Sequence, residues 1–143
     1  MRKRFDYDKV EPGEILGRRR IEISDEMIRT CAAAIDSDHP WYLLGSPFGG
    51  RIAPPTIFDN ESLRMLDACY ERFGSIHAAQ AWEFERPVCI GSIATIEVTI
   101  ADKFMKRDRP FLVMDLIAAD EAGAPLCRSR HTSLMTLHRG APS

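Results

Sequence analysis

The amino-acid sequence predicts an α+β fold, with one antiparallel sheet packed against a long helix. Two helical patterns lie in the first half of the chain, whereas the second half alternates apolar and polar residues as strands do. This order does not fit the regular strand–helix alternation of a parallel sheet. The 143 residues suit one ordinary domain, which we assign to residues 1–143.

The first strand and the first helix are predicted within residues 15–35. Residues 15–23 alternate roughly and are assigned to a strand. Ser24 can then cap a helix, and Asp25 and Glu26 follow in its first turn, where the helix dipole favours negative charge. The apolar face of this helix runs to Ile35, so the helix is expected to end before the polar stretch 36–40.

A second, longer helix is predicted from residues 54–56 to about Phe73, with Gly74 as its stop. Proline suits the first helical position because the N–H at that position has no partner within the helix. A helix of about 18 residues is a rod of roughly 27 Å. We therefore expect it to lie across the whole width of the sheet.

Four more strands are predicted after Gly74, at residues 78–84, 93–100, 111–118 and 127–137. The segment 111–118 is the most apolar and is expected at the centre of the sheet. The basic segment 102–110 is expected to form a hairpin tip. Cross-strand pairing accounts for His131, which lies in the middle of the last strand.

Composition narrows the class of function. The net charge of −2 gives no electrostatic footprint for nucleic acid. No apolar stretch approaches the ~20 residues that span a bilayer, so we expect no membrane segment. We also expect no signal peptide and a cytoplasmic location. The four cysteines are far apart without a C-x-x-C pair, so no zinc site or disulfide is predicted.

Polar residues gather in the loop "DSDHP" before a glycine-rich turn. Asp36, Asp38 and His39 could share acid–base work, although aspartate before proline is also a common turn former. The turn "SPFGGRIAPPT" then leads to the predicted helix start at residues 54–56. Free N–H groups at a helix N-terminus can stabilise an oxyanion, so the combination suggests an acyl-thioester site.

Three segments carry a resemblance to a known family: "DHPWY…SPFGGRIAPPTI", "HAAQAWEFERPVCIGS" and "RSRHTSLMTL". Over nearly its whole length the chain resembles the MaoC-like dehydratases of the hot-dog fold, which include the (R)-specific enoyl-CoA hydratases. The form "GG-x-IAPPT" is most like the fatty-acid-synthase-type, or N-terminal, branch of that family.

The resemblance implies syn hydration or dehydration of an enoyl or 3-hydroxyacyl thioester on CoA or acyl carrier protein. It also implies a homodimer, or a heterodimer with a second hot-dog subunit, and no metal or redox cofactor. In the family motif an Asp and a His five positions later handle water and the proton. A main-chain N–H at the start of the central helix binds the thioester oxygen.

The chain departs from that motif at several positions. With Pro40 aligned on the motif proline, Ser37 takes the place of the Asp and Tyr42 that of the His. Pro54-Pro55 replaces the family's His-Gly, which removes an N–H donor because proline has none. Thr56 or Ile57 is expected to supply a substitute donor.

The sequence thus predicts a hydratase or dehydratase, with a non-catalytic acyl-binding subunit and a hot-dog thioesterase as alternatives. The catalytic candidates are Asp36, Asp38, His39 and Tyr42. The substrate-binding candidates are Gly49, Gly50, Arg51, Pro54, Thr56 and Trp82.

Overall fold

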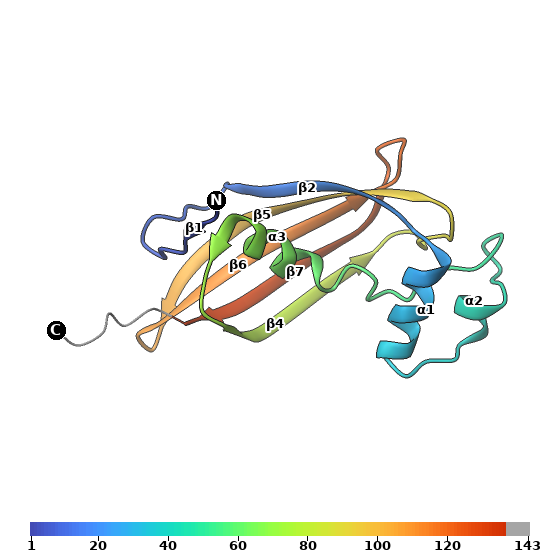
Figure 1. Ribbon diagram of the computed structural model, residues 1–143, viewed down its shortest axis with the longest axis horizontal. Helices are drawn as coiled ribbons and strands as arrows, with labels where there is room; N and C mark the ends of the chain where they lie inside the picture. The colour runs from blue at the N-terminus through green and yellow to red at the C-terminus, as the bar shows by residue number, and fades with distance from the viewer. Residues whose placement is uncertain (137–143) are drawn as a thin grey trace.

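A curved five-stranded antiparallel sheet dominates the computed structural model, which describes residues 1–136 (Figure 1). The strand order across the sheet is β2-β5-β6-β7-β4, and a short parallel pair, β1-β3, lies apart from it. The elements in chain order are β1 Lys3–Arg4, β2 Ile15–Glu22, α1 Asp25–Ala34, α2 Pro40–Leu43, α3 Glu61–Cys69, β3 Tyr70–Glu71, β4 Ser75–Phe84, β5 Ile93–Lys106, β6 Arg109–Ala119 and β7 Pro125–Met135.

The predicted strands are confirmed in kind and order, and the α+β class with them. β6 lies at the centre of the sheet, as its apolar sequence indicated. β5 and β6 run on to a tight hairpin at Arg107 and Asp108, where the basic hairpin tip was expected. Leu137, the predicted end of the last strand, lies outside the described residues. No helix within residues 1–136 is long and apolar enough to cross a membrane.

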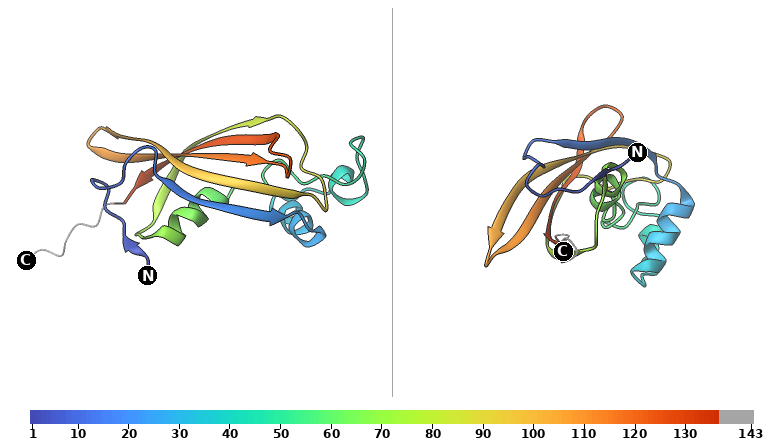
Figure 2. Two further views of the ribbon diagram at one scale, coloured as in Figure 1. Left: turned by 90° about the horizontal axis from the view of Figure 1, so that it is seen from above. Right: turned by 60° about the vertical axis from the view of Figure 1, so that its left-hand side comes forward.

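The sheet wraps around α3 and buries its inner face against it (Figure 2). The side chains of Ile96, Ile100, Leu112 and Met114 on β5 and β6 are completely buried. Leu66 of α3 packs into the same core cluster and is also fully buried. Burial of apolar surface on this scale is the main stabilising term of such a domain.

The first helix forms as its sequence predicts. Ser24 Oγ accepts a hydrogen bond of 3.2 Å from the backbone N–H of Met27 and so caps α1. Asp25 and Glu26 occupy the first turn, and Ile28 and Ala32 are the buried residues of the helix.

The prediction of a second helix from residues 54–56 to Phe73 is wrong at both ends. α3 covers only Glu61–Cys69, a rod of roughly 14 Å by the usual rise per residue. Residues 54–60 form successive turns instead, in which the N–H of Ile57 bonds to the carbonyl of Pro54 and that of Asp59 to Thr56. Proline lacks an N–H, and β-branched residues, Asp and Asn are weak helix formers, so tight turns win here.

The far end of α3 is set by a pairing that is distant in sequence. Tyr70 and Glu71 pair in parallel with Lys3 and Arg4 as the β1-β3 ribbon. The ring of Tyr70 also packs edge-on against Phe5, with 5.6 Å between the ring centroids. The chain must therefore become extended at Tyr70, where helical periodicity alone would have continued.

The three arginines of β2 are each held by a carboxylate. Arg18 Nε lies 2.5 Å from Glu97, Arg19 lies 3.1 Å from Glu61, and Arg20 lies 2.6 Å from Glu121. β2 is the last strand at its side of the sheet. That edge therefore carries a row of charged side chains, which is a common protection against further strand pairing.

His131 of β7 is buried on the inner face of the sheet. Its register partner on β4 is Gln80, as cross-strand pairing requires, and the ring nitrogens lie 3.0 Å from Gln80 Oε1 and 2.7 Å from Ser133 Oγ. His77 stacks on the ring at 4.0 Å between centroids. Burial first, then the charges of His77 and Arg72, lower the pKa of His131 to about 4.

A matched pair of leucines tests the core. Leu66→Ala removes a fully buried side chain, whereas Leu44 is 83% exposed. We expect Leu66→Ala to lower the free energy of unfolding by about 2–5 kcal/mol and Leu44→Ala by less than ~0.5 kcal/mol, measured by urea denaturation. Equal effects of the two changes would contradict the burial of α3.

The buried imidazole predicts a pH dependence of stability. His131 stays neutral in the folded chain down to its pKa of about 4, whereas in the unfolded chain it takes up a proton below about pH 6.5. Unfolding therefore binds a proton between these values, and the free energy of unfolding falls as the pH drops through this window, by on the order of 2–3 kcal/mol. Urea denaturation from pH 4.5 to 7 measures the slope. In His131→Gln this slope should shrink, and an unchanged slope would assign it to other groups.

Candidate active site

The loop after α1 begins with a backbone reversal at Asp36. Asp36 has a left-handed φ of 52°, a conformation that Asp adopts more easily than most residues. The N–H of Ser37 bonds to the carbonyl of Ala32 at 2.9 Å and closes the end of the helix. Asp36 and Asp38 are exposed, and among residues 1–136 neither carboxylate makes a hydrogen bond or an ion pair. They are accessible to water and to a ligand.

A short helix, α2, follows and was not predicted. His39 is its N-cap, because His39 Nδ1 accepts a hydrogen bond of 3.2 Å from the N–H of Trp41. Pro40 occupies the first position, where its missing N–H costs nothing. Since Nδ1 serves as the acceptor, a neutral His39 carries its proton on Nε2, which remains available as a donor.

α2 brings two of the four catalytic candidates together. The rings of His39 and Tyr42 lie 5.4 Å apart between centroids. His39 also packs edge-on to Trp41 at 5.2 Å. Tyr42 is half-buried and packs against the core. The two aspartates precede these rings on the same short loop, so all four candidates lie at one end of the molecule (Figure 1).

The glycine-rich turn folds back on itself. Gly49 and Gly50 have φ values of 89° and 140°, which only glycine adopts easily. Ser46 Oγ donates a hydrogen bond of 2.5 Å to the carbonyl of Gly50 and closes the turn. The turn places Phe48 against Trp41, with 5.7 Å between ring centroids. The glycine-rich turn and α2 are therefore packed together through these two aromatic rings.

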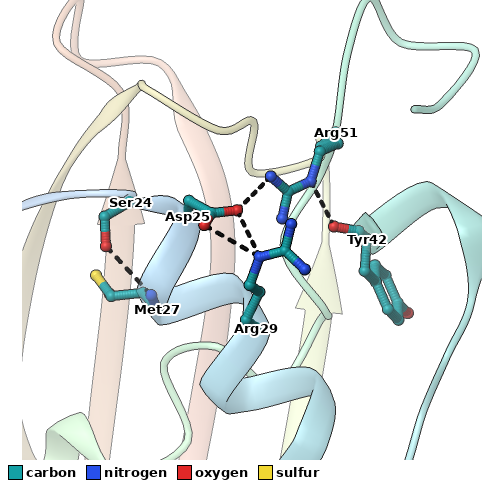
Figure 3. Close-up of polar contacts among 6 residues, drawn as sticks. All are labelled: Ser24, Asp25, Met27, Arg29, Tyr42 and Arg51. Atoms are coloured by element: carbon teal, nitrogen blue, oxygen red, sulfur yellow. Dashed lines mark hydrogen bonds and ion pairs between the residues drawn. The ribbon is translucent and has the colours of Figure 1, made fainter. Parts of the chain in front are cut away.

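Arg51, the next residue, is directed into the protein rather than toward solvent (Figure 3). Its Nε donates a hydrogen bond of 2.7 Å to the main-chain carbonyl of Tyr42, and its Nη1 donates to Asp25. Arg29 holds the other side of the same carboxylate, with Nε at 2.9 and 3.0 Å from the two oxygens. The hydrogen bond from Arg51, followed by that from Arg29, lowers the pKa of Asp25.

An apolar cavity of about 320 Å³ opens beside the glycine-rich turn. Phe48, Pro54 and Pro55 line one side, and Phe84 at the end of β4 lines another. Trp82 does not line the cavity but stacks on Phe84, with 5.6 Å between the ring centroids. Of the predicted substrate-binding residues, Pro54 lines this cavity, Gly49 and Gly50 adjoin it, and Trp82 supports its wall.

The two candidate substitutes for the lost N–H donor differ. The amide of Ile57 already donates to the carbonyl of Pro54 at 3.0 Å. The amide of Thr56 has no hydrogen-bond partner among the described residues. Thr56 follows Pro55 of the apolar cavity in sequence, but it lines a neighbouring cavity between α1 and α3. The hydroxyl of Thr56 turns the other way, to within 3.6 Å of Cys31 Sγ.

A second cavity, of about 450 Å³, separates α1 from the start of α3. At its side lies Glu61, a buried carboxylate at the first position of α3 that the sequence reasoning missed. Arg19 and Arg64 hold it at 3.1 and 3.6 Å. The spacing of Glu61 and Arg64 by three residues was the available signal. The carboxylate of Glu61 therefore lies at the N-terminus of α3, where a negative charge stabilises the helix dipole.

Within residues 1–136, no three His, Cys, Asp or Glu side chains are arranged to hold a metal ion. The four cysteines are free thiols, and burial raises the pKa of Cys127, which lines the apolar cavity, to about 11. That thiol stays protonated at neutral pH and is a poor nucleophile.

Comparison with known proteins places the fold. No protein-family model and no curated protein matches the chain. Solved structures do match. The (R)-hydratase PhaJ1 from Pseudomonas aeruginosa is 19% identical with a TM-score of 0.74, over 96% of this chain and 94% of that one. The truncated HadBC complex of Mycobacterium tuberculosis, a 3R-hydroxyacyl-ACP dehydratase, is 19% identical with a TM-score of 0.75, over 90% and 99%.

A MaoC-like dehydratase from Rhodospirillum rubrum is 18% identical with a TM-score of 0.69, over 92% of this chain and 97% of that one. Each match spans almost the whole of both chains, so the resemblance concerns the entire domain and not a shared motif. Identities this low establish the fold and leave the activity to the residues of the site. The chain therefore adopts the hot-dog fold that these hydratases and dehydratases share.

Proposed function

We propose that this protein is a MaoC-like hydratase or dehydratase that acts on enoyl or 3-hydroxyacyl thioesters of CoA or acyl carrier protein. The observation that carries the proposal is the apolar cavity beside α2. It combines an apolar wall with exposed carboxylates and an available imidazole Nε2 on the neighbouring loop. An apolar pocket with a few polar groups at its edge is the usual form of a small-molecule site.

The contacts of α2 connect the polar residues to the cavity. Ile52, a wall residue of the cavity, donates its N–H to the carbonyl of Trp41 at 3.0 Å. Phe48, another wall residue, contacts the ring of Trp41. The ring of His39 contacts that of Trp41, and Tyr42 follows Trp41 in sequence, so we propose that both side chains stand at the rim of the cavity. An acyl chain in the cavity would bring its thioester end toward these side chains.

The proposed chemistry uses a carboxylate as the base. In hydration, Asp36 or Asp38 takes a proton from water while the water oxygen bonds to C3 of the enoyl group. The electrons of the double bond move toward the thioester oxygen. C2 then takes the proton from the carboxylic acid formed in the first step, and the carboxylate is restored. His39 Nε2 and the hydroxyl of Tyr42 serve as hydrogen-bond donors or proton carriers. Dehydration is the same sequence in reverse.

The thioester oxygen gains negative charge during this reaction and needs a donor. Pro54 and Pro55 offer none, whereas the amide of Thr56 is unpaired among the described residues. We assign Thr56 N–H to this role. One well-placed donor of this kind contributes roughly 10²- to 10³-fold to the rate.

Departures from the family motif favour a second candidate function, that of a non-catalytic acyl-binding subunit. Two consecutive prolines at the cavity wall and a tyrosine in place of the motif histidine both reduce catalytic capacity while leaving the apolar cavity intact. The alternative is a non-catalytic subunit that binds the acyl chain for a second hot-dog chain carrying the complete Asp–His pair. The HadBC structure, a complex, shares the fold of this chain.

The loop carboxylates provide the direct test of catalysis. We expect the purified protein to hydrate crotonyl-CoA or a longer enoyl-CoA, followed by loss of the conjugated thioester absorbance. Asp36→Asn or Asp38→Asn should reduce kcat/KM roughly 10²- to 10⁴-fold, because a neutral amide cannot take the proton from water. Asparagine tolerates the left-handed backbone of residue 36, so the fold should be kept.

Asp108→Asn is the matched control, since Asp108 also has a left-handed φ but lies at the remote β5–β6 hairpin tip. It should leave kcat/KM unchanged. Wild-type activity that survives both loop changes would refute the assigned base. Activity that appears only after a second MaoC-like chain is added would support the non-catalytic subunit instead.

We also propose that β4 is the edge through which the chain pairs with a second hot-dog subunit. β4 is the outermost strand at its side of the sheet and offers ten residues for pairing. It has no lysine or proline, and Ile76, Ala79 and Ala81 are exposed. The opposite edge, β2, is protected by its arginines. An open apolar edge invites another strand.

Paired lysines test this interface. In an antiparallel pair of identical strands, Ala79→Lys with Ala81→Lys brings like charges together across the two copies, which disfavours pairing. We expect the double variant to shift the molar mass from light scattering toward that of one chain. Thr95→Lys, on the inner strand β5, should not change the mass. An unchanged mass in the β4 variant would place the interface elsewhere.

A further inference from the structure

One arginine connects the three segments that build the candidate site. Arg51 follows the glycine-rich turn, its Nε holds the carbonyl of Tyr42 in α2, and its Nη1 holds Asp25 at the start of α1 (Figure 3). The side chain of Arg51 is only 15% exposed. Its planar group offers donors in fixed directions, which suits two acceptors on different elements.

α2 depends on such contacts for its position. Four residues are too few for a helix that is stable by itself. No residue of α2 is fully buried. Among residues 1–136 its other polar connection to the body of the protein is the bond from the N–H of Ile52 to the carbonyl of Trp41, and the ring of Tyr42 adds an apolar contact with the core. The bond from Arg51 to the adjacent carbonyl of Tyr42 is therefore a large part of what fixes α2.

We infer that Arg51 is a positioning residue for the proposed reaction: it fastens the Tyr42 carbonyl to Asp25 and thereby fixes His39 and Tyr42 at the rim of the apolar cavity. The effect of Arg51 on catalysis rests on the proposed function. The structural half of the inference, that Arg51 fixes α2, stands on the contacts of Arg51 alone. Asp25 supplies the charge that orients the guanidinium, since Arg51 is the main cause of its lowered pKa.

This role differs from the substrate binding that the sequence suggested for Arg51. A guanidinium that binds a substrate presents its donors to the ligand. Two of the three nitrogens of Arg51 are engaged within the chain, and the third, Nη2, is buried and has no partner among the described residues. The kinetic signatures also differ. Loss of a substrate-binding group raises KM, whereas misplacement of reacting groups lowers kcat.

The conformational test uses the two tryptophans of the chain, Trp41 in α2 and Trp82 in β4. In a Trp82→Phe background the fluorescence reports Trp41 alone. Adding Arg51→Ala should shift the emission to longer wavelength and lower its anisotropy, because α2 is released. Arg51→Lys should do the same in part, since one ammonium group cannot reach both acceptors in the arginine geometry.

Arg29→Ala is the matched control. Arg29 bonds the same carboxylate of Asp25, with Nε at 2.9 Å, but among residues 1–136 its side chain makes no hydrogen bond to α2. It should leave the emission of Trp41 unchanged. Asp25→Asn keeps the shape of the acceptor while removing its charge, and should give an effect between those of Arg29→Ala and Arg51→Ala. It also serves if Arg51→Ala does not fold.

The kinetic test is made with Trp82 present. Arg51→Ala should lower kcat roughly 10- to 100-fold with little change in KM, and Arg29→Ala should stay within about twofold of the wild type. A rise in KM at constant kcat would overturn the inference in favour of substrate binding. Unchanged Trp41 emission in Arg51→Ala would overturn it as well.

The two proposals fail separately. A wild-type protein that hydrates no thioester, alone or with a second subunit, refutes the proposed function. The response of Trp41 to Arg51→Ala would still decide whether Arg51 positions α2. An active enzyme whose kcat is insensitive to Arg51→Ala and Arg51→Lys would retain the proposed function and exclude Arg51 as a positioning residue.

Discussion

The inner face of the five-stranded sheet must be shielded from water, and the rest of the molecule is arranged by that requirement. The side chains of β5 and β6 on this face are completely buried, and such burial supplies most of the stability of a small domain. α3 has only nine residues and covers the strands β2, β5 and β6. Beyond α3, Pro54 and Pro55 line the apolar cavity together with Cys127 of β7 and Phe84 of β4. The candidate site therefore lies where these two strands are lined by a turn instead of by the helix.

The sequence predicts the strands and α1 well because their signals are local. Alternation of apolar residues depends only on neighbours, and the Ser24 cap with acidic residues behind it depends on a single turn. The long helix fails for a different reason. Apolar residues from Phe58 to Phe73 fit one helical face, but the parallel pairing of Tyr70 and Glu71 with Lys3 and Arg4 involves residues almost seventy positions apart. Periodicity contains no information about that contact.

The sequence predicts which residue types gather at the candidate site, but it does not predict where their side chains point. The loop, the glycine turn and the proline pair were identified from their chemistry. α2 was missed because it has four residues and its cap is an imidazole, a side chain outside the usual set of capping residues. Arg51 was assigned to a ligand because its charged partner, Asp25, lies 26 positions away at the start of α1. An arginine beside a glycine-rich turn has the same sequence signature whether it faces solvent or the protein.

The unequal edges of the sheet have a consequence for how far assembly can go. The β2 edge carries three arginines held by carboxylates, whereas β4 carries exposed alanines. A sheet that can be extended on one side only joins a second sheet in the same way and then has no free side left. If β4 is the pairing edge, as proposed, growth closes at two subunits related by a two-fold axis. The same asymmetry would then permit a ten-stranded dimer and guard against open-ended fibres, which require both sides of every molecule to accept a neighbour.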